Sequence, residues 1–235
     1  QYQSRKLLLI YRIKTMKKIV TIAFWALGLV FCYLIYRSIT GPIEFKKIKE
    51  ERYTEVIKKL KDIRAAQDAY LRLNGKYADN FDELTKFIET AQFTITSQRD
   101  TSWNAFDETF KITVMRQGVV IDTLGHVSVK DSLFKNDNRY LHLRDLPPIK
   151  GKIPGQFIMK TGEITDKNNV KSSVFEAYVP KRVVLQGLDE DLVEKEIAKT
   201  SVEDVRGPNI KVGSLEELTV NGNWPTSYDA KIAKQ

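Results

Sequence analysis

IVTIAFWALGLVFCYLIY, residues 19–36, is an unbroken apolar run without a charged side chain. As a helix, these residues would rise about 27 Å, close to the ~30 Å hydrocarbon thickness of a bilayer. The run predicts a transmembrane anchor over residues 19–39. The alternative is a buried core helix, although such a helix normally carries a polar stripe. The candidate lipid-facing residues of the anchor are Ile19, Phe24, Trp25, Leu29, Phe31, Leu34 and Tyr36.

The residues that flank the apolar run indicate whether the anchor is cleaved and on which side of the membrane the C-terminal domain lies. Residues 1–18 form a basic segment, in which Met16-Lys17-Lys18 resembles the start of a secretory signal. No A-x-A cleavage site follows the run, so we expect an uncleaved signal anchor. Lys and Arg residues are about as frequent on both sides and do not fix the orientation. The signal-like start favours a single-pass protein whose C-terminal domain is periplasmic or otherwise extracytoplasmic.

Composition narrows the classes of function. The 235 residues carry a net charge of +8, from 38 basic and 30 acidic side chains that are interspersed. No Lys/Arg cluster interleaves with aromatic residues, so a nucleic-acid partner is not expected. The single cysteine, Cys32, lies inside the apolar run between bulky neighbours, which favours a membrane-buried thiol over a lipidated one. A basic surface that faces a membrane or a cell wall fits this composition.

A second helix is predicted over residues 42–74, separated from the anchor by Gly41-Pro42. Its apolar residues recur in steps of three and four, and Asn74-Gly75 is a typical helix end. The apolar stripe either packs on the protein's own domain or binds a partner. Its candidate interaction residues are Tyr53, Val56, Leu60, Ile63 and Tyr70.

Residues 75–235 predict an α+β soluble domain. Asn80 can cap a short helix that begins at Phe81. The alternating segment 109–116, a turn at Gln117-Gly118 and the segment 119–123 predict a β-hairpin. Residues 156–160 and 174–179 predict a second hairpin, extended past Pro180 by 182–185, and residues 189–199 predict a helix. The predicted fold is therefore a transmembrane helix, a long amphipathic helix and an antiparallel β-sheet domain.

The chain shows little sign of catalytic chemistry. It has two histidines, His126 and His142, and no G-x-S-x-G, H-E-x-x-H or P-loop motif. A pairing of His142 with Asp145 lacks an accompanying nucleophile motif. We predict no catalytic site, no metal site and no cofactor. Trp224, between turn residues near the C-terminus, either covers its own domain or is a binding anchor for a ligand.

Three short segments resemble the end of the long helix in type IV pilins and type II secretion pseudopilins: Ile63-Arg-Ala-Ala-Gln-Asp-Ala-Tyr70, Asn74-Gly75-Lys76-Tyr77 and Phe81-Asp-Glu-Leu84. The resemblance implies an N-terminal hydrophobic helix that leads into an amphipathic helix and an antiparallel sheet. The Gly-Phe…Glu processing pattern of that family does not open residues 19–36. The expectation is thus a pilin-like subunit that keeps its anchor.

Three hypotheses for the function follow. The first is a non-catalytic structural or assembly subunit of a cell-envelope machine for secretion, motility or a pilus-like fibre. It implies contact with membrane lipid and with other envelope proteins, as a homo- or hetero-oligomer. The second is a membrane-tethered module that binds a ligand or the cell wall. The third is an envelope enzyme that uses dispersed carboxylates.

Overall fold

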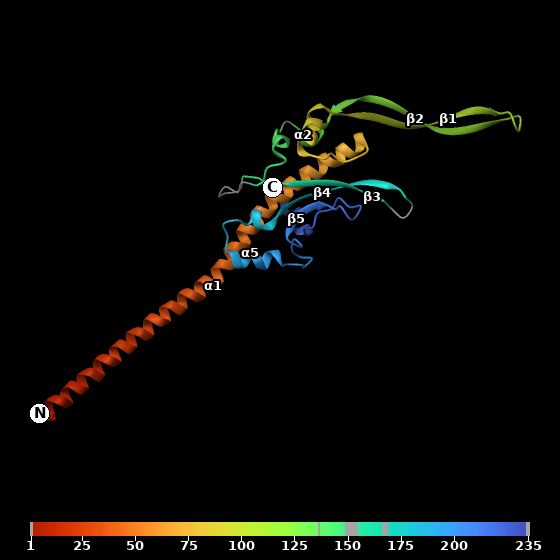
Figure 1. The fold of residues 1–235 in the computed structure, drawn as a ribbon. Helices are drawn as coiled ribbons and strands as arrows, with labels where there is room; N and C mark the ends of the chain where they lie inside the picture. The colour runs from red at the N-terminus through yellow and green to blue at the C-terminus, as the bar shows by residue number, and fades with distance from the viewer. Residues whose placement is uncertain (1, 136, 149–154, 166–168, 234–235) are drawn as a thin grey trace.

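The computed structural model describes residues 2–135, 137–148, 155–165 and 169–233, without the side chains of residues 2–16 and 19. The dominant element is helix α1 (Tyr2–Asn74), which is 73 residues long. Its N-terminal half stands clear of the rest of the protein, and its C-terminal half runs through the folded body (Figure 1). Helix and sheet are both present, so the predicted α+β class is confirmed.

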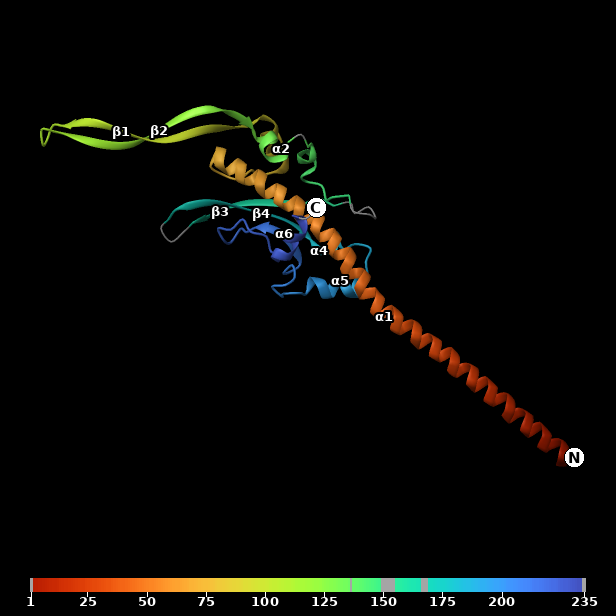
Figure 2. The ribbon, with the colours of Figure 1, turned by 180° about the vertical axis from the view of Figure 1, so that it is seen from behind.

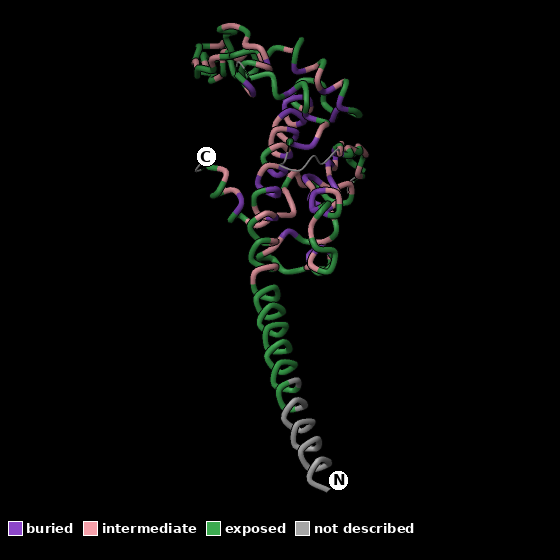
Figure 3. The backbone as a smooth tube through the Cα atoms, turned by 90° about the vertical axis from the view of Figure 1, so that its left-hand side faces the viewer, coloured by how far each residue is buried: buried purple, intermediate pink, exposed green. Residues whose placement is uncertain are grey.

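The N-terminal half of α1 is exposed along its length. Every residue from Val20 to Ile39 is exposed, which Figure 3 shows as an unbroken green helix. A stretch of this helix is long and apolar enough to cross a membrane, and none of that stretch is buried in the protein. The alternative of a buried core helix is therefore wrong.

The predicted break at Gly41-Pro42 is also wrong, because α1 continues through Pro42. Proline lacks the N–H group that would bond to the carbonyl of Ser38 in a regular helix. Ser38 is exposed, so solvent can satisfy the freed oxygen. The anchor and the amphipathic helix, predicted as two elements, are two parts of one helix.

The C-terminal half of α1 is the centre of the hydrophobic core. Tyr53, Val56, Leu60 and Ile63 are completely buried there. Burial of each of the three aliphatic side chains contributes about 1.5–3 kcal/mol relative to exposure. The prediction that the stripe packs on the protein's own domain is confirmed. The helix ends at Asn74 as predicted, with Gly75 at φ 75°, where a residue without Cβ is favoured.

A three-stranded antiparallel sheet packs along this part of α1, in the order β3 (Ile158–Thr165), β4 (Lys171–Pro180) and β5 (Asn209–Gly213). Its first two strands confirm the second predicted hairpin, with greater length. The predicted strand beyond Pro180 is wrong, because the chain turns there into helix α4 (Lys181–Val184).

Short helices complete the body. Helix α2 (Phe81–Thr90) begins as predicted, since the side chain of Asn80 accepts a 2.8 Å hydrogen bond from the N–H of Glu83. The predicted helix at 189–199 is α5 (Glu190–Ile197), capped by Asp189. The other helical segments are α3 (Val129–Phe134), the 3-10 turn η1 (Arg139–His142) and α6 (Thr226–Ile232).

One polar side chain inside the core fixes the end of α1 to the chain that follows it. Gln67 is fully buried, and its amide bonds both backbone groups of Ala78, at 2.9 Å to the N–H and 3.0 Å to the carbonyl. Gln67 thus replaces the backbone partners that a turn outside regular structure lacks.

We expect Gln67→Ala to lower the free energy of unfolding by about 2–3 kcal/mol, because two buried backbone groups lose their partners. Denaturant titration of the full chain measures the change. Arg72→Ala, at an exposed site on the same helix, is the matched control and should change stability by less than about 0.5 kcal/mol. Equal losses in both variants would contradict this role for Gln67.

Candidate functional site

The most distinctive feature of the fold is a two-stranded ribbon. Strand β1 (Gln92–Asp107) pairs antiparallel with β2 (Ile112–Ser128), with one register shift between Ile95 and Thr96. The ribbon leaves the body near the far end of α1 and projects well beyond it (Figures 1 and 2). The fold therefore has two small antiparallel sheets, where one β-sheet domain was predicted.

The ribbon replaces the first predicted hairpin, which is wrong in its turn. Gln117-Gly118 lies inside β2, and the chain reverses after Asp107. The Asp107 carboxylate accepts hydrogen bonds from the N–H groups of Thr109 and Phe110, at 3.0 and 3.3 Å. Such Asx geometry is a strong local turn signal.

Gly118 has a different role from the predicted turn. A Cβ atom at this position would lie 2.6 Å from the ring of Trp103, so the indole ring occupies the space that the glycine leaves open. Trp103 comes from the neighbouring strand, and its ring covers the glycine backbone, a known stabilising device in sheets. The glycine thus marks close packing between the two strands.

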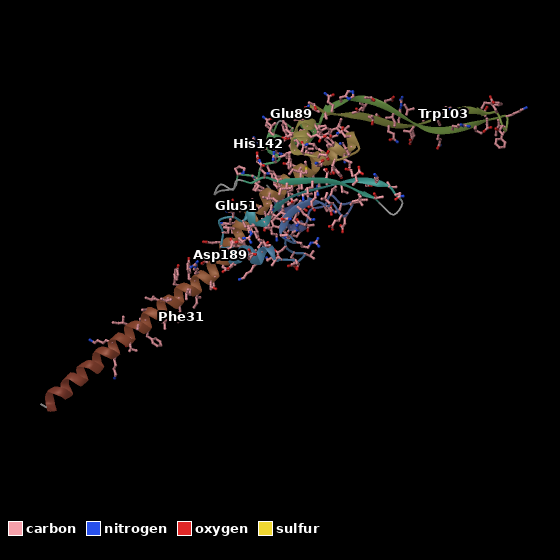
Figure 4. All side chains as sticks on the ribbon, viewed as in Figure 1. Phe31, Glu51, Glu89, Trp103, His142 and Asp189 are labelled. Carbon is pink, nitrogen blue, oxygen red and sulfur yellow. The ribbon has the colours of Figure 1, made fainter. Side chains whose placement is uncertain are left out.

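The ribbon exposes apolar side chains on both faces. Trp103 is half exposed, and Met115 and Ile121 are 70% and 65% exposed. Figure 4 shows Trp103 far from the other labelled residues of the body. Exposed apolar residues gathered on one element make the ribbon a candidate interaction surface. The large apolar residues exposed on the ribbon are Ile95, Trp103, Phe106, Phe110, Ile112, Met115, Val119, Ile121 and Leu124.

The outer edges of the ribbon are open. Within the described part of the chain, β1 and β2 form a sheet of two strands only. Each strand therefore presents one row of backbone N–H and C=O groups to its surroundings, which is the usual template for adding a further strand.

A pocket of about 480 Å³ lies at the opposite end of the body, where the exposed half of α1 begins. Helices α1, α5 and α6 line it, and Pro42 and Phe45 form part of its wall. Its charged residues have both signs, with Lys46, Lys195 and Lys231 among the cations. The pocket is thus polar and adjoins the apolar part of α1.

An ion cluster with two buried members, Lys49 and Glu196, lines this pocket. The Glu196 carboxylate lies 3.0 Å from Lys49 Nζ and 3.1 Å from Lys199 Nζ. Asp204 pairs with Lys199 at 3.0 Å and with Lys49 at 3.5 Å. The side chains of Lys49 and Glu196 are only 7% and 2% exposed. These groups therefore hold α1, α5 and the loop that carries Asp204 together.

Lys181 also belongs to this cluster. It is fully buried, and its ammonium group donates 2.7 Å hydrogen bonds to the backbone carbonyls of Glu196 and Val205. The ammonium group also lies 3.8 Å from the Glu196 carboxylate. Burial lowers the pKa of Lys181, and the negative charge of Glu196 opposes that shift. The cation is thus held by one carboxylate and two carbonyl groups.

Asp204 is held in its charged form. Burial by itself raises the pKa of this carboxyl, but hydrogen bonding to Lys199 and the charges of Lys199 and Lys49 outweigh burial and lower it. The cluster is therefore arranged as a structural network of charges. One oxygen of Glu196, Oε1, has no hydrogen-bond partner among the described residues.

The residues predicted as an interaction stripe lie neither on the ribbon nor in this pocket. Tyr53, Val56, Leu60, Ile63 and Tyr70 are all in the core, so in this fold they face the protein's own strands and helices. The alternative in which they face a partner does not fit this packing. Their periodicity predicted burial correctly but did not identify what covers them.

The structure also shows where the other residues singled out in the sequence lie. Trp224 packs against the core, and its indole N–H donates a 3.2 Å hydrogen bond to Asp229, which matches the alternative that it covers its own domain. The anchor residues Phe24, Trp25, Leu29, Phe31, Leu34 and Tyr36 are exposed on α1, and the side chain of Ile19 lies outside the described residues. The imidazole of His142 lies 3.4 Å from the carboxylate of Asp145; the imidazole is largely exposed and the carboxylate is half exposed.

The sequence contained signals for the residues that the prediction missed. Glu196 lies on the same face of its short helix as buried Val193, where a carboxylate is unusual. Lys181 continues the buried alternation of Ala177 and Val179 beyond the end of β4. In the residues that the structure describes, no group of three or more His, Cys, Asp and Glu side chains is arranged to hold a metal ion.

Comparison with known proteins gives no relative from which a function could be transferred. No protein-family model matches the chain, and no curated protein and no solved structure is significantly similar to it.

Proposed function

We propose that this chain is a membrane-anchored, non-catalytic assembly subunit of a cell-envelope machine for secretion, motility or a pilus-like fibre. The N-terminal part of α1 anchors it in the lipid bilayer as a single pass. The folded body lies on the extracytoplasmic side, where the ribbon contacts another envelope protein. The partner is a second copy or a different subunit.

The observation that carries this proposal is the exposure of the ribbon. A ribbon of two strands without a covering layer is only marginally stable in water. This one nevertheless keeps large apolar side chains, such as Phe106 and Met115, away from the core of the body. A partner that covers these side chains would supply the missing layer.

The length of α1 supports the same proposal. From Pro42 to Asn74 the helix rises about 50 Å at 1.5 Å per residue. It thus acts as a stalk that holds the base of the ribbon at a set height above the membrane. The order of anchor, long helix and antiparallel sheets also fits the pilin-like layout implied by residues 63–84.

Shortening the ribbon tests the proposal. Residues 95–125 are replaced by Asn-Gly, which closes a two-residue hairpin directly between the paired residues Thr94 and His126. We expect this variant to unfold like the full chain, because the deleted residues lie outside the core, but to leave its larger assembly. Mild detergent extraction after cross-linking in cells, followed by native sizing, measures the assembly.

A matched variant keeps the full ribbon and changes Trp103, Phe106, Met115 and Ile121 to threonine. It should lose the assembly in the same way, because threonine retains β-propensity but removes the apolar contact area. If both variants stay in an assembly of unchanged size, the ribbon is not the contact site. Dispersal only on neutralising Lys195 and Lys231 would assign the contact to the pocket, and would favour the ligand-binding alternative.

A further inference from the structure

The outer edge of β2 has a charge pattern that complements itself. The segment RQGVVID, residues 116–122, places five uncharged residues between a cation and an anion, with Val119 at its centre. Arg116 and Asp122 are an even number of positions apart on one strand, so both point to the same face of the ribbon. A second β2 in antiparallel direction, with Val119 opposite Val119, would bring each Arg116 opposite Asp122 of the other copy.

We infer that β2 pairs in this register with β2 of a second copy of this chain, so that two ribbons join into one four-stranded antiparallel sheet. The inference rests on the proposed function, because it identifies the partner of the same ribbon. The second copy satisfies the open backbone groups of β2, and the two-fold symmetry forms both Arg116–Asp122 pairs at once.

The opposite face of the ribbon fits this arrangement. Met115, Val119 and Ile121 occupy alternate positions on that face, and each is at least half exposed. Pairing about Val119 places Val119 directly opposite Val119 of the second copy. Ile121 then lies diagonally from Val119 and Met115 of that copy, so these apolar side chains shield one another from water. On the charged face, Asp122 is already 3.2 Å from Arg99 of its own ribbon. The pairing adds Arg116 of the second copy to that ion pair.

The stalk brings two such edges together. Copies anchored in one membrane with the same orientation hold their ribbons at the same height, because the same length of α1 separates ribbon and anchor in each. The ribbon extends far beyond the body (Figures 1 and 2). It can therefore meet the ribbon of a neighbour without contact between the two bodies.

The edge of β1 is the competing site. Arg99 and Asp107 flank Trp103 symmetrically, so β1 could also pair with itself. In that register Asp100 would lie opposite Phe106 of the second copy, and Asp107 already binds the turn. The uncharged stretch of β2 has neither conflict, which favours β2.

Reversing the charge of Arg116 or of Asp122 tests the proposed register between the two β2 strands. The full chain is placed in lipid nanodiscs or detergent micelles, and its self-association is measured by sedimentation. Arg116→Asp and Asp122→Arg should each weaken self-association by roughly tenfold or more, because each creates two like-charge pairs. An equal mixture of the two variants should recover most of the association, since both pairs between a copy of one variant and a copy of the other then join opposite charges. Only the contact of the substituted position 122 with Arg99 of the same ribbon stays repulsive. Lys111→Glu changes charge at the turn of the ribbon, away from residues 116–122, and should have little effect.

A cross-link provides a second measurement. In a Cys32→Ala chain, Val119→Cys should form a disulfide-linked dimer in membranes on mild chemical oxidation, because directly opposite Cβ atoms lie about 4.5–5.5 Å apart. Trp103→Cys reports pairing through β1 in the same way. A dimer from Trp103→Cys alone, or unaltered association of both single charge variants, would overturn the inference.

The outcomes separate this inference from the proposed function. If the shortened ribbon loses its assembly but neither charge exchange nor the Val119 cross-link has the expected effect, the ribbon binds a different subunit and only the inference fails. If the shortened ribbon keeps its assembly, the proposed function itself fails.

Discussion

Glu196→Ala is expected to lower the free energy of unfolding by about 3–5 kcal/mol, the usual cost of removing one partner from a buried ion pair. The carboxylate is 2% exposed and lies between Lys49 and Lys199, with buried Lys181 close by. Without it, Lys181 and Lys49 stay buried with fewer opposite charges around them. Denaturant titration of the full chain in detergent micelles, read by circular dichroism, gives the change.

Controls separate the buried charge from a general effect on α5. Glu194 lies on the same helix and pairs with Arg182, and both side chains are more than half exposed. Glu194→Ala should therefore lower the free energy of unfolding by less than about 1 kcal/mol. Glu196→Gln keeps the volume of the side chain but removes its charge, so it should lose nearly as much stability as Glu196→Ala if the charge supports the cluster. A loss below about 1 kcal/mol for Glu196→Ala would show that solvent reaches the cluster.

The cluster also shows which parts of the fold a sequence can reveal. The apolar stripe of α1 and the cap of α2 are local patterns, and both were predicted correctly because periodicity and capping act within a few residues. Lys49 and Glu196 are 147 residues apart in the chain. Only the packing of α5 against α1 brings them together, so no spacing in the sequence could identify the pair.

The incorrect predictions arose where a residue that often ends a helix or strand lies inside one. Gln117-Gly118 has the composition of a turn, yet Gly118 accommodates the ring of Trp103 from the neighbouring strand. Pro42 normally ends a helix, yet α1 continues at an exposed site where the freed carbonyl can be solvated. In both cases the residue type was compatible with two structures, and its surroundings decided between them.

The ribbon as a candidate site was missed for a related reason. Apart from residues 109–116, its strands alternate only weakly between apolar and polar residues, because neither face is covered by the body. Alternation is a signal of one buried face, so a strand with neither face buried lacks it. The self-complementary charges of residues 116–122 are visible in the sequence, but they gain a meaning only once β2 is known to have an open edge.

The largest effect is expected for two arginines in the middle of the apolar run. Ten Leu, Ile, Phe and Val residues within 19–36 favour insertion by about 3–6 kcal/mol in total, at 0.3–0.6 kcal/mol each. Leu27→Arg with Phe31→Arg leaves eight of these residues, which favour insertion by about 2.4–4.8 kcal/mol, and adds about 5–7 kcal/mol of cost at the centre of the span. Insertion then becomes unfavourable, and the protein should leave the membrane fraction on alkaline extraction.

The rate at which Cys32 reacts with a maleimide measures directly whether the apolar run is inserted in the membrane. Its side chain is exposed on α1, so the folded protein itself does not shield the thiol. In membranes, only surrounding lipid or another subunit would protect it from a membrane-impermeant maleimide. We expect slow labelling of the parent chain and fast labelling of the double-arginine variant.

Ser38→Arg with Ile43→Arg adds the same charge beyond the run and should leave both membrane retention and slow labelling intact. Fast labelling of Cys32 in the parent chain in sealed membranes would show that residues 19–36 do not span the bilayer, and the anchor would have to be abandoned.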